Sequence, residues 1–378
     1  MTGTHSLCID NIPSFHDKHE SLDFLTSNMK IFRGFQHPNL AKHCALTIGN
    51  FDGVHRGHQA MLALLNSEAR HRGVPSCVMT FEPHPREFFA QLQHNPSIAP
   101  PRVANLRDKL DELNRCGVDQ CVVLRFDERL ANQSPQAFIQ DVLIHGLGAQ
   151  YILVGDDFRF GKQRVGDHHM LTQIGQPLGL DVGKMNSYQI SLPRSHAFES
   201  RPTPADAKMP AQQNDALRVS SSAVRLALSK GQMDEASQLL GRPYAISGHV
   251  VFGRQLGRSL NARTLNIRFK AKSAATQGIF VVLAHGLAPT ALHGVANFGV
   301  RPTLDANDVN GGQILLETHC LDWPRGLSME GGYGKIVKIE LLHKLHDELK
   351  YDSLESLQKG IQEDCDLARE WFQSHPST

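Results

Sequence analysis

The chain has 378 residues, of which 40% are hydrophobic and 20% are charged, and this composition suits a globular protein of two domains. Its 39 Lys and Arg residues balance its 38 Asp and Glu residues, so the formal net charge of +1 gives no general attraction to nucleic acid or to an anionic membrane. No apolar run approaches the roughly 18 residues of a membrane-spanning helix. Residues 1–28 form a polar tail without a signal-peptide pattern, and the scattered cysteines fit a reducing compartment, so we expect a cytoplasmic protein.

From residue 44 to residue 185, apolar runs alternate with helical patterns about every 30 residues, which is the length of a βαβ unit. Runs such as 151–154 are apolar throughout, as in parallel strands that are covered on both faces. The pattern predicts an α/β domain with a doubly wound, Rossmann-like parallel sheet. The predicted strands are 44–49, 75–81, 119–125, 150–155 and 180–185, and the predicted helices are 57–71, 104–116, 134–146 and 168–176.

Beyond residue 185, the sequence no longer alternates between apolar runs and helical patterns at this spacing. Residues 193–216 hold four prolines and few apolar residues, which predicts a mobile insertion, and two short helices follow at 221–230 and 232–240. Six short β-rich segments and one C-terminal helix then predict a small antiparallel barrel closed by that helix. We place a tail at 1–28, a first domain at 29–241 and a second at 242–378. The predicted barrel strands are 245–252, 264–269, 278–285, 292–299, 313–320 and 335–342, and the helix is 353–373.

The most informative segment is 49–58, with the sequence GNFDGVHRGH, between a predicted strand and a predicted helix. A sharp turn at glycines would point free backbone N–H groups and the positive end of the helix at one spot, which suits a phosphate. His55 and His58 are three residues apart, so both rings can lie on one face of the first turn. Gly57 between them leaves room for a ligand beside the backbone. The predicted occupant is the triphosphate of a nucleotide.

Three more segments end at the same edge of the predicted sheet. Residues 81–85 (FEPHP) and 154–161 (VGDDFRFG) follow strands, and prolines give the first an extended exit. Residues 219–225 open a helix, where serines can cap the helix and offer hydroxyls to a phosphate, with Arg225 one turn further on. Each segment alone is also explained as a loop, a turn or a cap. Together they favour a binding site.

The predicted barrel offers a second set of polar residues. Gly253 and Gly257 belong to a glycine-rich loop that could wrap phosphates. Thr264 and Asn266 lie on one face of a strand and offer oxygen ligands for Mg²⁺. Glu317 is an ionisable residue inside an apolar strand. A bulge at the glycines and a solvent-facing carboxylate would explain these residues equally well.

These segments together closely resemble the bacterial bifunctional riboflavin kinase/FAD synthetases, over roughly 29–373 without the insertion. The resemblance implies that the first domain is an FMN adenylyltransferase of the His-x-Gly-His nucleotidyltransferase superfamily, in which the phosphate of FMN attacks ATP to give FAD and pyrophosphate. It implies that the second domain transfers phosphate from ATP to riboflavin, with Glu317 as the base and with Mg²⁺ held by Thr264 and Asn266. It also implies catalytic roles for His55, His58 and Arg225. The implied nucleotide-binding residues are Gly49, Asn50, Phe51, Asp52, Gly53, Gly57, Asp157, Ser220, Ser221, Ser222, Gly253 and Gly257.

Four positions depart from the family pattern. Arg263 stands at a usual proline before the metal ligands, Phe280 at a usual tyrosine, His346 at a usual arginine and Ser222 at a usual threonine. Because three of these departures lie in the second domain, an adenylyltransferase with a weakened kinase is the near alternative. Two more distant alternatives are a flavin or nucleotide sensor without turnover and an RNA-handling protein. The expected partners are riboflavin, FMN and ATP, and a homo-oligomer is compatible with the sequence.

Overall fold

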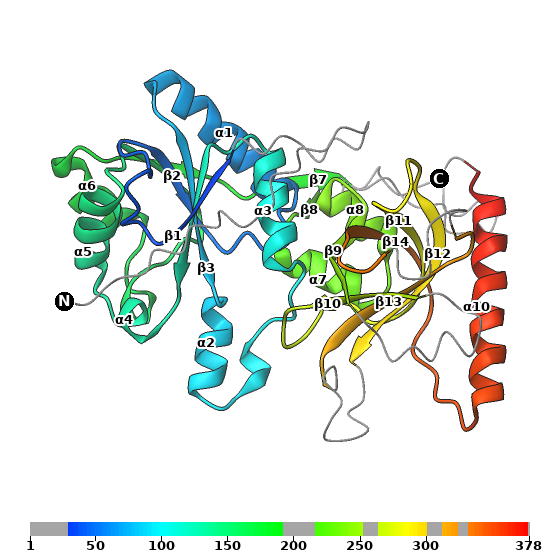
Figure 1. Cartoon of the computed structure of the whole chain (residues 1–378). Coiled ribbons are helices and arrows are strands. Elements are labelled where there is room, and N and C mark those ends of the chain that lie inside the picture. The colour runs from blue at the N-terminus through cyan, green and yellow to red at the C-terminus, as the bar shows by residue number, and fades with distance from the viewer. Residues whose placement is uncertain (1–28, 192–215, 252–263, 301–311, 324–331, 377–378) are drawn as a thin grey trace, which may run out of the picture.

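The computed structural model describes residues 29–191, 216–251, 264–300, 312–323 and 332–376. The predicted tail and nearly all of the predicted insertion lie outside these ranges. Ala216, which we assigned to the insertion, instead begins strand β8 (Ala216–Arg218), which pairs with β7 (Gln189–Ser191). Figure 1 shows two lobes, a sheet flanked by helices and a barrel, with α3, α7 and α8 between them.

The first lobe is built on a six-stranded parallel sheet with the strand order β1-β4-β3-β2-β5-β6. The five predicted strands are confirmed. An additional edge strand, β1, was not predicted because it is only four residues long and only one of its side chains is buried. The strands are β1 (Lys30–Arg33), β2 (Ala45–Ile48), β3 (Ser76–Glu82), β4 (Gln120–Arg125), β5 (Tyr151–Gly155) and β6 (Asp181–Met185).

Helices cover both faces of this sheet because successive strand residues point to opposite sides. Leu46 faces a cluster with Leu143 and Leu171, while Ala45 faces a cluster with Leu62 and Leu113. The doubly wound prediction is thereby confirmed. The helical segments are α1 (Arg56–Arg72), α2 (Pro85–Leu92), η1 (Pro96–Ile98), α3 (Leu106–Arg115), α4 (Glu128–Ala131), α5 (Pro135–Ala137), the π-helical η2 (Phe138–Gly146), η3 (Lys162–Arg164), α6 (His168–Gly175) and η4 (Gln176–Leu178).

The strand order reverses between β2 and β5. From β2 the chain winds through β3 to β4 on one side, and β5 with β6 extends the sheet on the other. In open α/β sheets the ligand crevice lies beyond the carboxyl ends of the strands at such a reversal. The loops after β2 and β5 therefore meet at the expected binding edge.

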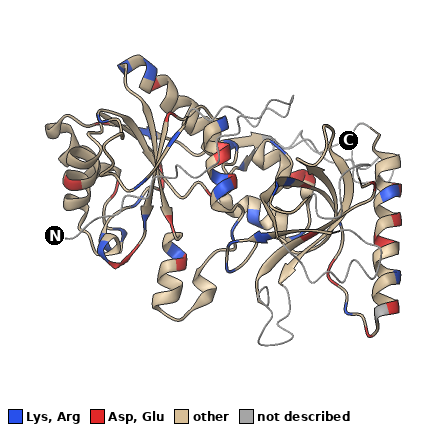
Figure 2. Cartoon of the chain, viewed as in Figure 1, with Lys and Arg blue, Asp and Glu red and all other residues tan. Residues whose placement is uncertain are grey.

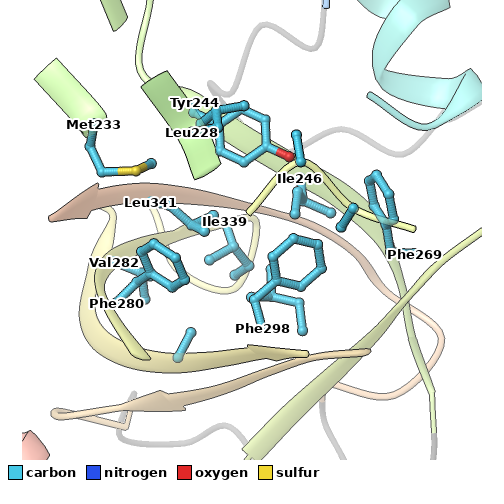
Figure 3. Packing of buried hydrophobic residues seen from close by; sticks show 14 of the residues in the cluster. Leu228, Met233, Tyr244, Ile246, Phe269, Phe280, Val282, Phe298, Ile339 and Leu341 are labelled. Carbon is cyan, nitrogen blue, oxygen red and sulfur yellow. The ribbon is translucent and has the colours of Figure 1, made fainter. Parts of the chain in front are cut away.

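The second lobe is a closed antiparallel barrel of six strands in the order β10-β13-β12-β11-β14-β9. Its interior is apolar, and Figure 3 shows Phe280, Phe298 and Ile339 pointing into it. The C-terminal helix α10 (Leu354–Ser374) covers the outside of β11 and β12 through residues such as Phe372, as predicted. The strands are β9 (Tyr244–Val251), β10 (Thr264–Phe269), β11 (Gly278–His285), β12 (Leu292–Val300), β13 (Ile314–Cys320) and β14 (Ile336–His346).

The helices α7 (Ser221–Ser229) and α8 (Met233–Leu240) share the hydrophobic core of the barrel although they precede residue 242. Leu228 and Met233 lie beside Tyr244 at one end of this core (Figure 3). The Tyr244 hydroxyl also donates to the Val103 carbonyl at 2.9 Å, which ties the barrel to the sheet domain. The predicted boundary thus falls inside a packed region, and it stays a prediction.

Charges of both signs are interspersed along α3 and α10 (Figure 2). Within the described ranges, no helix is sufficiently long and apolar to cross a membrane.

Candidate active site

The segment 49–58 forms a tight corner between β2 and α1, as predicted. His55 is the N-cap of α1, and its Nδ1 accepts a hydrogen bond from the backbone N–H of His58 at 3.3 Å. Because Nδ1 is an acceptor here, a neutral His55 ring carries its proton on Nε2. The turn is tight, with left-handed φ angles at Phe51 (48°), Gly53 (87°) and Val54 (40°). Strain of this kind is often found at functional sites.

The two histidine rings stack on each other, with centroids 3.7 Å apart and an interplanar angle of 15°. Burial lowers the pKa of His55 to about 4, and burial together with the neighbouring His55 lowers the pKa of His58 well below its usual value. Both rings are therefore neutral at pH 7. Among the described residues, the Nδ1 atom of His58 is buried without a hydrogen-bond partner. Buried nitrogens without a partner are uncommon in folded proteins, so this atom sets His58 apart from an ordinary structural histidine.

Gly57 also has a structural role beside the predicted one, which stays a prediction. A Cβ atom at this position would lie 3.2 Å from the His55 ring and 3.4 Å from the Val219 carbonyl. The glycine therefore lets the histidine pair and the chain before α7 approach the backbone of α1 closely.

Asp52 is fully buried and connects the corner to other segments through hydrogen bonds. Its carboxylate accepts from the backbone N–H groups of Val103 and Ala104 at 3.1 Å, and from Arg225 at 2.7 Å. Arg225 also donates to the Pro101 carbonyl at 2.8 Å. Arg225 therefore engages Asp52 and the loop before α3 through Nη2 and Nε and does not line the cleft, so its predicted grip on a phosphate stays a prediction.

A cleft of about 680 Å³ opens beside the histidine pair. The ends of β2, β3 and β5 and the start of α7 line this cleft. These are the four segments that were predicted to meet at one edge of the sheet. Predicted site residues in its lining are Gly49, Asn50, Phe51, His55, Gly57, His58, Asp157, Ser220, Ser221 and Ser222. The lining does not include Asp52, Gly53 or Arg225.

The serines at the start of α7 have separate tasks. Ser220 caps the helix by accepting from the Ala223 N–H at 3.2 Å, as predicted. The hydroxyl of Ser221 donates to the Asp52 carbonyl at 2.9 Å and so links α7 to the corner. Because both serines line the cleft, the first backbone N–H groups of α7 lie close to it.

Sequence reasoning missed an aromatic wall and several cations in this cleft. The aromatic lining residues are Phe81, Phe89, Phe126, Phe138, Phe158, Phe160 and Tyr188, and the cationic ones are Arg86, Arg159, Arg164 and Arg218. Phe81, Phe158, Arg159 and Phe160 lie inside the quoted motifs, so the available signal was the composition of those motifs. The other residues lie outside the motifs, and only the fold places them at the cleft.

The exit from β3 is tighter than predicted. The Glu82–Pro83 peptide is cis, and Pro85 begins α2 instead of extending the strand. His84 caps this helix, and burial lowers its pKa to about 4. Pro85 favours the first position of a helix because its missing N–H is not needed there, so the prolines signalled a helix start.

The predicted residues of the barrel meet on the outer face of neighbouring strands. Asn266 of β10 lies opposite Glu317 of β13, and Glu317 lies opposite Asn297 of β12. Residues directly opposite in antiparallel strands share a face. Within the described residues, the side-chain oxygen of Asn297 is buried without a hydrogen-bond partner. Thr264 lies two residues before Asn266 and therefore on the same face. Neutral side-chain oxygens that could bind a metal ion thus lie on the same face as the Glu317 carboxylate.

The other barrel predictions have mixed outcomes. Gly253, Gly257 and Arg263 lie outside the described residues. Phe280 is fully buried in the barrel core. His346 pairs through Nε2 with Asp364 of α10 at 2.7 Å, and this carboxylate and the Asp347 backbone raise its pKa despite partial burial.

Two family models match the chain in tandem. The model described as FAD synthetase matches residues 37–194, and the model described as riboflavin kinase matches residues 240–372. The first range holds the histidine corner and most of the cleft, and the second holds the barrel and α10.

Known proteins match along nearly the whole chain. Bifunctional riboflavin kinase/FMN adenylyltransferases from Escherichia coli K12 and Haemophilus influenzae are 38% and 35% identical, covering 91% and 92% of this chain and 98% and 100% of their own lengths. The enzyme of the same description from Pseudomonas fluorescens is 38% identical over 90% of this chain and 97% of its own length. The crystal structure of a protein described as a macrolide-efflux protein from Streptococcus pneumoniae has a TM-score of 0.63 at 22% identity, covering 91% of this chain and 99% of its own, and supports the fold alone.

Proposed function

Because this chain belongs to the family of bifunctional riboflavin kinase/FMN adenylyltransferases, we propose that it phosphorylates riboflavin to FMN and then adenylates FMN to FAD. Each step uses one ATP, and the second releases pyrophosphate. The observation that carries the proposal is the cleft in which the histidine corner meets the other three motif segments. The kinase barrel stands beside it in the same chain.

For adenylyl transfer, we place the phosphates of ATP at the corner. The neutral rings of His55 and His58 can each donate one N–H, and the start of α1 adds the positive end of a helix. These groups are held before substrate arrives, so they can stabilise the charge that grows on the leaving pyrophosphate. The attacking oxygen comes from the FMN phosphate, so the protein needs no nucleophile of its own and acts by alignment.

The aromatic end of the same cleft suits the flavin ring. Phe81, Phe89 and Phe126 contact each other through Phe126, with centroid distances of 5.8 Å and 5.9 Å. A flat apolar ring gains from packing against such side chains. With FMN at this end, its phosphate would point toward the corner where the phosphates of ATP lie.

For the kinase step, we assign the outer face of β10, β12 and β13. Glu317 would accept the proton of the riboflavin 5′-hydroxyl as the new bond to phosphorus forms. Thr264 and Asn266 offer neutral oxygen ligands, and the unsatisfied oxygen of Asn297 on the same face adds to a donor set that suits Mg²⁺. When bound, Mg²⁺ would neutralise charge on the phosphates of ATP in both sites.

The test uses the purified full chain with riboflavin, ATP and magnesium, and chromatography of the flavins. The expected result is the appearance of FMN followed by FAD. FAD formed only from supplied FMN would instead support the weakened-kinase alternative, and flavin binding without any product would support a sensor. A cytoplasmic location and the oligomeric state stay predictions.

A further inference from the structure

Lys109 of α3 is buried beneath the corner that we assign to the phosphates. Its side chain is almost fully buried, and its ammonium lies 3.4 Å from the hydroxyl of Thr80 in β3. That hydroxyl donates to the backbone carbonyl of Asn50 at 3.3 Å. Asn50 in turn lines the cleft beside the histidine pair. A buried charge is therefore connected to the phosphate corner through a single side chain.

Among the residues that the structure describes, no carboxylate forms an ion pair with this ammonium. An ammonium has three N–H donors, and among the described residues its one hydrogen bond is to Thr80. The nearby carboxylates are already engaged, Asp52 by Arg225 and Glu82 by Arg102. A buried charge without a partner destabilises a fold, and an apolar side chain of similar size would remove this cost. Packing alone does not explain a lysine at this position.

We propose that Lys109 is a positioning residue of the adenylyl-transfer site. Through Thr80 it fixes the backbone of Asn50, and it places a positive charge behind the loop that receives the phosphates of ATP. The triphosphate of ATP would supply negative charge close to this ammonium. This role rests on the proposed adenylyl transfer at the histidine corner and adds to it a residue that does not line the cleft.

The main test is Lys109→Met in the full chain, because methionine keeps the length of the side chain without the charge. We expect kcat/KM for ATP in FAD formation to fall at least about ten-fold, which corresponds to about 1.4 kcal/mol. Riboflavin phosphorylation by the same molecule should stay within about two-fold, since the barrel does not use this charge. The urea midpoint should stay the same or rise, because a buried charge has been removed.

Two further variants sharpen the test. Arg115→Met removes one charge from the same helix at a position that is 42% exposed, and it should leave FAD formation unchanged. Lys109→Arg keeps the charge and should retain more FAD formation than Lys109→Met, even where the larger side chain lowers stability.

An NMR titration distinguishes the effect of the Lys109 charge from an effect of side-chain packing. Burial and the charge of Arg102 lower the pKa of Lys109, whereas the charges of Glu82 and Asp52 raise it. The charge of Lys109 in turn helps to lower the pKa of His58 and of His84. In Lys109→Met the pKa of His84, followed by NMR titration, should rise relative to the wild type and to Arg115→Met.

The proposal is overturned if Lys109→Met makes FAD at the wild-type rate. It is equally overturned if both activities and the urea midpoint fall together, since that pattern marks a structural residue. Failure of the underlying site has a different signature, because His58→Ala would then still make FAD. Loss of FAD formation in His58→Ala together with full activity in Lys109→Met would reject the role of Lys109 alone.

Discussion

The two proposed sites are assembled in different ways. In the sheet domain, both histidines, the helix cap and the turn come from one stretch of ten residues, and the strand reversal brings the other segments to it. In the barrel, Asn266, Glu317 and Asn297 come from three separate strands and meet only through register. A motif within one segment can be recognised from the sequence alone. Residues that lie side by side on neighbouring strands can be recognised as a site only when the pairing of the strands is known. The two sites should therefore also be separable by mutation.

The largest expected effect is on the kinase. Glu317→Gln removes the proposed base and keeps the size of the side chain, so phosphorylation of riboflavin should fall about 100- to 10,000-fold. Adenylation of supplied FMN should be unchanged, because the histidine corner is untouched. Both rates can be measured by chromatography of the flavins. A variant that still makes FMN at the wild-type rate would remove Glu317 from the mechanism.

The reciprocal change is His58→Ala. It removes a preorganised donor to the phosphates, and FAD formation from FMN should fall about 100- to 1,000-fold while riboflavin phosphorylation continues. FMN should then accumulate when riboflavin and ATP are supplied. Parallel loss of both activities would mean that the sites are not independent.

Acid should distinguish the two lobes through the sign of their histidine pKa shifts. In the sheet domain, His55 and His84 have a pKa of about 4, so they stay neutral in the native state while the unfolded chain binds protons below about pH 6.5. Their contribution is constant above this pH, and stability falls as the pH drops from about 6.5 to about 4, by about 1.4 kcal/mol per pH unit for each group. In the barrel, the raised pKa of His346 gives the opposite sign, because its stabilising contribution is present below about pH 6.5 and is lost as the pH rises through the raised value.

The measurement for this prediction is the urea midpoint at pH 7.5 and at pH 5. His84→Asn keeps an acceptor for the cap of α2 but cannot titrate, so its midpoint should fall less in acid than that of the wild type. Equal falls would show that His84 is not neutral in the native state.

The smallest expected effect concerns the departure at His346. His346→Arg restores the residue usual in the family and keeps a donor for Asp364, and partly exposed pairs of this kind contribute about 0–1 kcal/mol. Kinase activity should therefore change less than about five-fold. A much larger increase would revive the weakened-kinase alternative.

Much of the fold could be predicted because its signals are local. Apolar runs predicted the four inner strands and the edge strand β6, and the glycine corner predicted the start of α1. The edge strand β1 was missed because a four-residue segment with one buried side chain carries no clear period. The helix α2 was missed because its prolines were taken to extend the strand. The contacts within the candidate site could be predicted less completely than the fold. Nothing near Asp52 in the sequence indicates that its carboxylate is taken up by backbone groups of Val103 and Ala104, about 50 residues further on.

The central claim is that the paired histidines hold the phosphates of ATP. It is tested most directly by the crystal structure of the full chain with magnesium and an ATP analogue that cannot be split between the α- and β-phosphates. We expect phosphate oxygens within hydrogen-bonding distance of the His55 and His58 rings, with the triphosphate at the start of α1. A nucleotide bound elsewhere, with both rings turned to solvent or buried without contact, would contradict it.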